Sequence, residues 1–190
     1  MTLLKKLLKK IRLLILMISV ASVGLAIGAA KTSAATTATT PNTAPIGSQL
    51  HSKLATLSWY GVFDNLQYKI NGSQVILSGQ VTSEHAITKH DAENIAKQVP
   101  GVTSVVNHIE VLPPSPFDNQ IRRAEYRTIF SQSDLGRYTM GAAPPVHIIV
   151  KNGHVILEGV VMDQMDKTIA GLAANSVPGV FSVTNNLRIG

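Results

Sequence analysis

The chain has 190 residues, 45% of them hydrophobic, and a formal charge of +6, a size that allows one or two domains. Cysteine is absent, which excludes disulfides, thiolate metal ligands, a cysteine nucleophile and an acylated-cysteine anchor. The positive charge is concentrated at the start, since residues after position 35 include 11 Lys and Arg against 11 Asp and Glu. A neutral remainder without a basic-aromatic signature argues against nucleic acid as a partner.

Residues 1–35 have the layout of a secretory signal peptide. Five basic residues precede the apolar run LLILMISVASVGLAIGAA at 13–30, and small residues follow it. Cleavage is expected after Ala30, Ala34 or Ala35, with the later pair favoured. The alternative is an uncleaved anchor, because 18 apolar residues just span a bilayer. Either outcome predicts export, to the periplasm or otherwise to the cell envelope.

Two further segments divide the chain. Residues 36–45 are mainly Ala, Thr and Pro without apolar periodicity, which is typical of a disordered spacer. Residues 112–116 contain three prolines, which interrupt regular structure and stiffen the backbone. We therefore predict a first domain over 46–111, a proline linker over 112–116 and a second domain over 117–190.

The two domains repeat the same phrases in the same order. VILSGQV at 75–81 and VILEGVV at 155–161 share five of seven residues. PGVTSVVNHIEV at 100–111 and PGVFSVTNNLRI at 178–189 share six of twelve. The offsets of 80 and 78 residues differ by a short deletion, so the pattern indicates a tandem duplication.

Each copy opens with a predicted helix and a hairpin. The helices follow from apolar or small residues at helical spacing: Ile46, Leu50, Leu54 and Leu57 in the first copy, and Phe117, Ile121, Ala124 and Thr128 in the second. Short β-favouring runs then lead into two-residue turns. Gly72-Ser73 suits a type II′ turn and Asn152-Gly153 a type I′ turn.

The second half of each copy continues with a glycine, a helix and a strand. Gly79 and Gly159 interrupt β-favouring runs, which predicts a bulge or a close backbone approach. Polar residues at 82–84 and 163–166 are candidate caps for a second helix, which Pro-Gly pairs end. Alternating residues then predict a last strand. The expected fold is α+β, with two tandem α-β-β-α-β domains, each a small three-stranded mixed sheet packed by two helices.

The pattern VxLxGxV followed by PGVxxVxNxLxV resembles the BON domain family, also called transport-associated. The matching residues in the first copy are Val75, Leu77, Gly79, Val81, Pro100, Gly101, Val102, Val105, Asn107, Ile109 and Val111. Those in the second copy are Val155, Leu157, Gly159, Val161, Pro178, Gly179, Val180, Val183, Asn185, Leu187 and Ile189. The resemblance covers roughly residues 46–190.

The resemblance implies a non-enzymatic binding module of the bacterial envelope, usually periplasmic, associated with phospholipid and with envelope or osmotic stress. The shared residues Gly79, Gly159, Pro100, Gly101, Pro178, Gly179, Asn107 and Asn185 are interpreted as structural. Two segments depart from the family pattern, the aromatic stretch SWYGVFDN and the long loop QSDLGRYTMGAAPP. Either departure is expected to change the binding surface.

A candidate lipid-binding face lies on the first helix of the second copy. Arg123, Tyr126, Arg127 and Phe130 share one face at spacings of three and four residues. Arginines beside aromatic rings suit anionic headgroups. The alternative is that the two rings belong to the core, with Glu125 awkwardly placed toward the assumed buried side.

Other candidate residues have structural interpretations. Trp59, Tyr60 and Phe63 could serve as a ligand platform or partner anchor, but more often such rings fill the gap between a helix and a sheet. His85 and His90 lack the spacing of a helical metal pair, and His147 and His154 are expected to be solvated or cross-strand residues. No catalytic motif, cofactor or metal site is indicated.

Small size also favours contact between the copies. A domain of about 65 to 75 residues buries a small fraction of its surface, so we expect the two to pack against each other. The leading functional hypothesis is an exported double-BON module that contacts an anionic phospholipid surface. The alternative is a protein-interaction or self-assembly module with envelope protein partners, joined through exposed sheet edges. The sequence leaves the oligomeric state open.

Overall fold

The computed structural model describes residues 45–140 and 143–190. These residues belong to one compact unit, Pro41–Gly190. The predicted signal peptide, and all of the predicted spacer except its last residue, lie outside the described residues. Within the described ranges, no helix combines the length and apolar character needed to cross a membrane.

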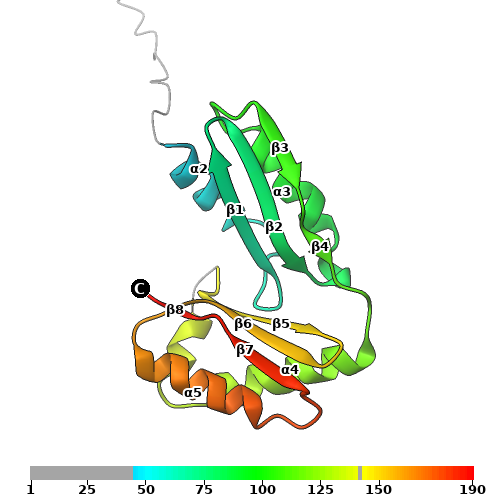
Figure 1. The fold of residues 1–190 in the computed structure, drawn as a ribbon, viewed down its shortest axis with the longest axis vertical. Coiled ribbons are helices and arrows are strands. Elements are labelled where there is room, and N and C mark those ends of the chain that lie inside the picture. The colour runs from blue at the N-terminus through cyan, green and yellow to red at the C-terminus, as the bar shows by residue number, and fades with distance from the viewer. Residues whose placement is uncertain (1–44, 141–142) are drawn as a thin grey trace, which may run out of the picture. The chain divides into compact units, whose positions relative to one another are not determined.

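The described chain contains two copies of one α+β arrangement, as predicted (Figure 1). The first domain consists of α2 (Ile46–Leu54), β1 (Asn65–Asn71), β2 (Gln74–Val81), the 3₁₀ helix η1 (Ser83–His85), α3 (Ile87–Lys97), β3 (Ser104–Asn107) and β4 (Glu110–Val111). The second domain consists of α4 (Pro116–Phe130), the 3₁₀ helix η2 (Gly136–Thr139), β5 (Val146–Lys151), β6 (His154–Val161), α5 (Gln164–Asn175), β7 (Ser182–Asn185) and β8 (Arg188–Ile189).

Each sheet is mixed, as predicted, and has the middle strand of its domain at the centre. In the first domain β2 pairs antiparallel with β1 and parallel with β3 and β4. In the second domain β6 pairs antiparallel with β5 and parallel with β7 and β8. The predicted last strand is therefore two short strands in each copy, separated by a break after the motif asparagine.

The two helices of each domain cover one face of its sheet. Leu50 of α2 and Ala92 of α3 share a buried cluster with Val75 and Leu77 of β2. In the second domain, Ile121 of α4 lies in the core with residues of β5, β6 and α5. Figure 1 shows α4 and α5 on the same side of the second sheet. Helix α4 is therefore an integral part of the second core.

The hairpin turns have the backbone signs that their residues predict. Gly72 has a φ of 59°, whereas Ser73 is absent from the positive-φ positions, as a type II′ turn requires. Asn152 and Gly153 have φ values of 53° and 77°, as a type I′ turn requires. The same two-residue connection is thus built with different chemistry in the two copies.

Gly79 and Gly159 mark a close approach between strands. A Cβ atom on Gly79 would lie 2.0 Å from the carbonyl oxygen of Asn65, and one on Gly159 would lie 2.1 Å from that of Pro145. Both glycines have positive φ, 109° and 120°. Pairing of β1 with β2 runs through Gly79 without an inserted residue, so the close approach is the correct interpretation and the bulge is not.

Asn107 and Asn185 tie a helix to the strand break in the same way. Nδ2 of Asn107 donates to the carbonyl of Lys89 at 3.0 Å, and its Oδ1 accepts from Ile109 N–H at 3.1 Å. Asn185 makes the equivalent contacts with Lys167 and Leu187 at 2.7 and 3.2 Å. Each shared asparagine therefore bonds a helix carbonyl and satisfies the N–H two residues on, which the strand break leaves without a ladder partner.

Candidate functional site

The structure places the predicted lipid-binding residues along helix α4. Ser115 starts the helix, because its Oγ accepts the N–H of Asp118 at 3.1 Å and Pro116 follows it. Arg123 and Arg127 are exposed. Neither forms an ion pair with any side chain that the structure describes. The helix therefore presents two free cations to solvent.

The aromatic members of this face differ in burial. The Tyr126 side chain is 38% exposed, whereas Phe130 is partly buried and packs against the second-domain core. Their rings meet edge to face with centroids 5.0 Å apart. The alternative core interpretation thus applies to Phe130, and Tyr126 remains accessible between the arginines. We call Arg123, Tyr126, Arg127 and Phe130 the arginine face.

The opposite side of α4 corrects part of the sequence interpretation. The apolar stripe of Phe117, Ile121 and Ala124 predicts a buried Phe117, but this residue is 46% exposed and its ring lies beside that of Phe181. The buried positions are Asp118, Ile121, Arg122, Glu125 and Ile129. Polar residues are among these buried positions because backbone groups in and after β5 need hydrogen-bond partners. Asp118 accepts from Gly153 N–H at 2.8 Å, and Arg122 donates to the Val150 carbonyl at 2.6 Å.

Glu125 is the unusual member of that stripe. Its side chain is fully buried, and neither carboxylate oxygen has a hydrogen-bond partner among the described atoms. Burial raises its pKa to about 8, because a buried carboxylate loses the hydration that favours its charged form. Glu125 is therefore mostly protonated at neutral pH.

The aromatic stretch predicted to depart from the family pattern joins the two domains. We call residues 58–64, between α2 and β1, the docking loop. Val62 and Phe63 pack against the second-domain core, and the Val62 carbonyl accepts the Ile148 N–H of β5 at 2.8 Å. Phe63 lies edge-on to Tyr126 with centroids 6.3 Å apart. The expectation that these rings fill a gap within the first domain is therefore wrong for Phe63.

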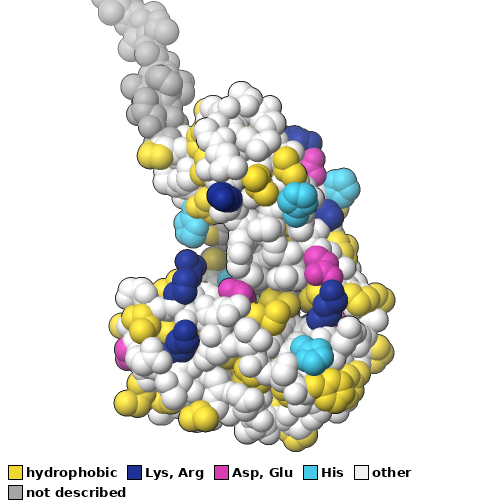
Figure 2. All heavy atoms as spheres, viewed as in Figure 1, with side chains coloured by type: hydrophobic (Ala, Val, Ile, Leu, Met, Phe, Trp, Pro, Cys, Tyr) yellow, Lys and Arg dark blue, Asp and Glu magenta, His cyan; other side chains and the backbone are white. Residues whose placement is uncertain are grey.

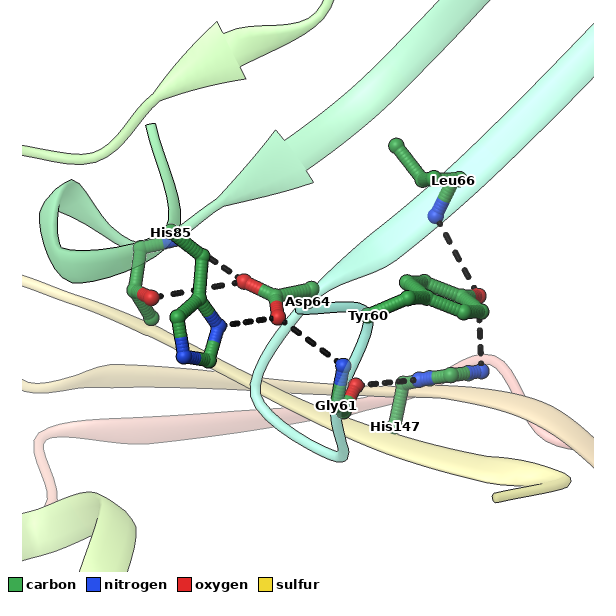
Figure 3. A network of polar contacts seen from close by, with 7 residues as sticks. Tyr60, Gly61, Asp64, Leu66, His85 and His147 are labelled. Carbon is green, nitrogen blue, oxygen red and sulfur yellow. Dashed lines mark hydrogen bonds and ion pairs between the residues drawn. The ribbon is translucent and has the colours of Figure 1, made fainter. Parts of the chain in front are cut away.

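The rest of the aromatic stretch divides between solvent and the second domain. Trp59 is 59% exposed, with its ring 6.2 Å from that of His85. Tyr60 instead turns toward β5, and its hydroxyl lies 3.0 Å from Nε2 of His147 (Figure 3). The expected contact between the two domains is present, and Tyr60 and Phe63 contribute to it.

His147 connects the docking loop to β5 through both of its ring nitrogens. Nδ1 lies 3.3 Å from the Gly61 carbonyl, while Nε2 faces Tyr60. Only 6% of its surface is exposed. Of the two alternatives expected for His147, the cross-strand one holds, since it lies opposite Glu158 on β6, and the solvated one is wrong. Burial lowers the pKa of His147 and raises that of Tyr60 to about 12. Both groups are therefore neutral at pH 7.

Asp64 fixes the docking loop from the other side. Its fully buried carboxylate accepts from Gly61 N–H at 3.0 Å, Thr82 N–H at 2.9 Å and His85 Nδ1 at 2.6 Å. Gly61 thus donates its N–H to Asp64, and its carbonyl bonds to His147 Nδ1 (Figure 3). The loop reaches the second domain with its backbone already restrained.

A groove lies between β1 and the second domain. It has a volume of about 970 Å³ and is lined by residues that include Tyr68 and Leu66 of β1 and Pro145, Glu158 and Arg188 of the second domain. Strand β1 pairs only with β2 within the described sheets. Its outer edge therefore has no strand partner there and borders a space large enough for an extended peptide.

The remaining predicted residues do not form one site. The motif residues are distributed between the two domains. Gly79, Gly159 and the asparagines act on the backbone as described above, and Gly101 and Gly179, which follow Pro100 and Pro178, also have positive φ, 92° and 88°. His154 is exposed and bonds to Ser182 Oγ at 2.7 Å. The described residues contain no group of three or more His, Cys, Asp or Glu side chains placed to hold a metal ion. On the face shown in Figure 2, charges of both signs are interspersed.

Two copies of a small α+β unit, joined through the docking loop, define a tandem-domain protein. The chain matches the BON domain model over residues 44–113 and 133–190. It therefore belongs to the BON domain family, whose members are binding modules. The second matched segment begins after α4, so the arginine face lies outside it. No curated protein matches the chain.

Two solved structures of CdsD, a structural protein of the type III secretion system of Chlamydia trachomatis, are similar to the chain. The first contains the C-terminal domain, is 13% identical and aligns over 75% of this chain and 96% of that chain, with a TM-score of 0.30. The second is also 13% identical and aligns over 76% and 93%, with a TM-score of 0.29.

Proposed function

We propose that the protein is an exported BON module of the cell envelope that attaches to anionic phospholipid through the arginine face of α4, with a role in envelope or osmotic stress. Export is supported by the basic and apolar residues at the start of the sequence. The observation that carries the lipid proposal is a pair of exposed arginines on either side of an accessible tyrosine, neither with an ion-pair partner in the described part of the chain.

The physical argument combines charge and ring position. Each arginine near an anionic membrane contributes about 1 kcal/mol of attraction, and a tyrosine ring favours the boundary between headgroups and acyl chains. Phe63 and Phe130 hold the Tyr126 ring from two sides. The ring is therefore preorganised at the surface, and less conformational entropy is lost on binding.

Flotation with vesicles of phosphatidylglycerol and phosphatidylcholine tests the proposal. The Arg123→Glu/Arg127→Glu variant is expected to bind about thirtyfold more weakly, since losing two favourable charges costs about 2 kcal/mol before any repulsion is counted. Lys53→Glu/Lys69→Glu is the matched control, because both lysines are exposed, lack ion pairs among the described residues and change the charge equally. Equal loss in the two variants would reject the arginine face.

A second candidate is a module for protein interaction or self-assembly. The open edge of β1 in the groove supports it, because an extended peptide can add to such an edge through main-chain hydrogen bonds. Light scattering over a range of protein concentrations tests self-assembly. A constant monomer mass would reject that form of the proposal.

A further inference from the structure

The hydrogen bonds of His147 define its proton state. A carbonyl oxygen only accepts, so Nδ1 carries the ring proton and donates it to Gly61. Nε2 of the neutral ring then accepts from the Tyr60 hydroxyl. The Tyr60 oxygen also faces the N–H of Leu66 at 3.5 Å, which leaves its own hydrogen available for His147. The arrangement is complete only while the imidazole is neutral.

A second proton on the ring would break this pattern. Nε2 would become a donor that points at the donating hydroxyl of Tyr60, and a positive charge would be placed where the side chain is 6% exposed. Asp64 attracts this charge, but its carboxylate is already bonded to Gly61, Thr82 and His85. The loss of hydration is the largest effect and holds the pKa of His147 below 6.5.

The other charged or titratable groups near His147 do not offer it a free acceptor. Glu158 lies opposite it in the β5–β6 register, and its oxygens bond to Asn186 and Gln67. His51 of α2, Tyr68 of β1 and Arg188 of β8 line the same groove. Arg188 adds positive charge, and His51 adds more when it is protonated. The surroundings therefore oppose a charged His147 on balance.

We propose that His147 is an acid-sensitive latch between the two domains, which releases the docking loop from β5 when Nε2 gains a proton. The other side-chain hydrogen bonds across the domains, among the described residues, are exposed, including Lys151 to Glu110 at 2.6 Å and Asn119 to Glu84 at 3.1 Å. Exposed ion pairs contribute little to stability. The buried histidine is thus the titrating group whose state most affects the contact.

The direction of the pH effect follows from the lowered pKa. The histidine is neutral when docked and takes up a proton more readily once released, so acid favours release. The latched arrangement has its full stability above the ordinary histidine pKa of 6.5 and loses stability as pH falls below it. The loss is up to about tenfold in the docking equilibrium for each pH unit until the docked histidine also titrates. This inference does not depend on lipid binding.

Hydrogen exchange of the full chain measures the latch at the Ile148 amide, which donates to the Val62 carbonyl. Rates at pH 7.5 and 5.0 are corrected for intrinsic exchange. The wild type is expected to lose protection at pH 5.0, by up to about thirtyfold over the 1.5 units below 6.5. His147→Gln should show no such pH effect, because its amide does not titrate, whereas the exposed control His154→Gln should behave like the wild type.

Two results would overturn the latch. One is equal corrected protection of Ile148 in the wild type at both pH values. The other is the same acid loss in His147→Gln, which would assign the effect to another group. If His147→Gln does not fold, an NMR titration of the His147 ring in the wild type decides: a midpoint at or above 6.5 without change at Ile148 rejects the proposal, and a lower midpoint that coincides with loss of Ile148 protection supports it.

Discussion

The ring of Phe63 in the first domain packs edge-on against the ring of Tyr126 in the second, with centroids 6.3 Å apart. This contact joins two groups of residues that are 63 positions apart in sequence and that looked unrelated there. It also places a partly buried ring beside the accessible ring of the arginine face. Docking of the domains and the shape of the proposed lipid surface therefore depend on the same side chain.

Phe63→Ala should destabilise the docked protein by about 2 kcal/mol, because a partly buried phenylalanine loses less than the 3 to 5 kcal/mol typical of a full core position. Thermal unfolding followed by circular dichroism measures the loss. Trp59→Ala is the control, since Trp59 is 59% exposed and should change stability little. A smaller effect for Phe63 than for Trp59 would contradict the docking role.

Gly159→Ala should cost about 3 kcal/mol or more, since the new methyl group would overlap the Pro145 carbonyl and the φ of 120° is unfavourable for alanine. Gly72→Ala separates the two causes. Gly72 also has positive φ, but a Cβ there meets nothing within 4 Å, so about 1 kcal/mol is expected. Chemical denaturation compares the variants, and equal losses would show that the close approach is unimportant.

Glu125→Gln should stabilise the protein at pH 8 and have a smaller effect at pH 5. The folded-state pKa of Glu125 is raised to about 8 from 4.5, so the folded protein holds a proton that the unfolded chain releases. Stability is highest below pH 4.5 for this group and falls as pH rises toward 8, by up to about 1.4 kcal/mol per unit.

Melting temperatures of the wild type and Glu125→Gln between pH 5 and 8 test this direction. The gap between them should widen with pH. Asp134→Asn, at an exposed acidic position, serves as the control for surface charge. A constant gap would mean that Glu125 is already ionised in the folded protein.

The fold was largely predictable because its determinants are local. The alternation in VILSG and VILEG, the Asn152-Gly153 turn and the Gly79 and Gly159 positions each act on neighbouring backbone, and the duplication states them twice. Helix ends were less certain. Asp163 caps α5 as the sequence allowed, with its Oδ1 2.8 Å from Asp166 N, whereas no side-chain cap bond forms at Thr82, where a 3₁₀ turn precedes α3.

The site was only partly predictable because it depends on contacts between distant segments. Helical spacing placed Arg123, Tyr126 and Arg127 together correctly. The same spacing also placed Glu125 toward the buried side, where it lies. It could not show that Arg122 would be buried, since ordinary burial preferences place charged residues outside. The role of His147 depends on Tyr60, 87 positions away. The departure of SWYGVFDN from the family pattern was the one available signal, and it marked the docking loop.

The hydrogen bond from Ile148 to Val62 has a consequence for solubility. β5 lies at the border of its sheet, and bare strands in that position readily recruit other chains into intermolecular sheets. The loop of the neighbouring domain occupies part of this border. Any change that separates the two domains, whether mutation or acid, therefore uncovers the edge of an aggregation-prone strand.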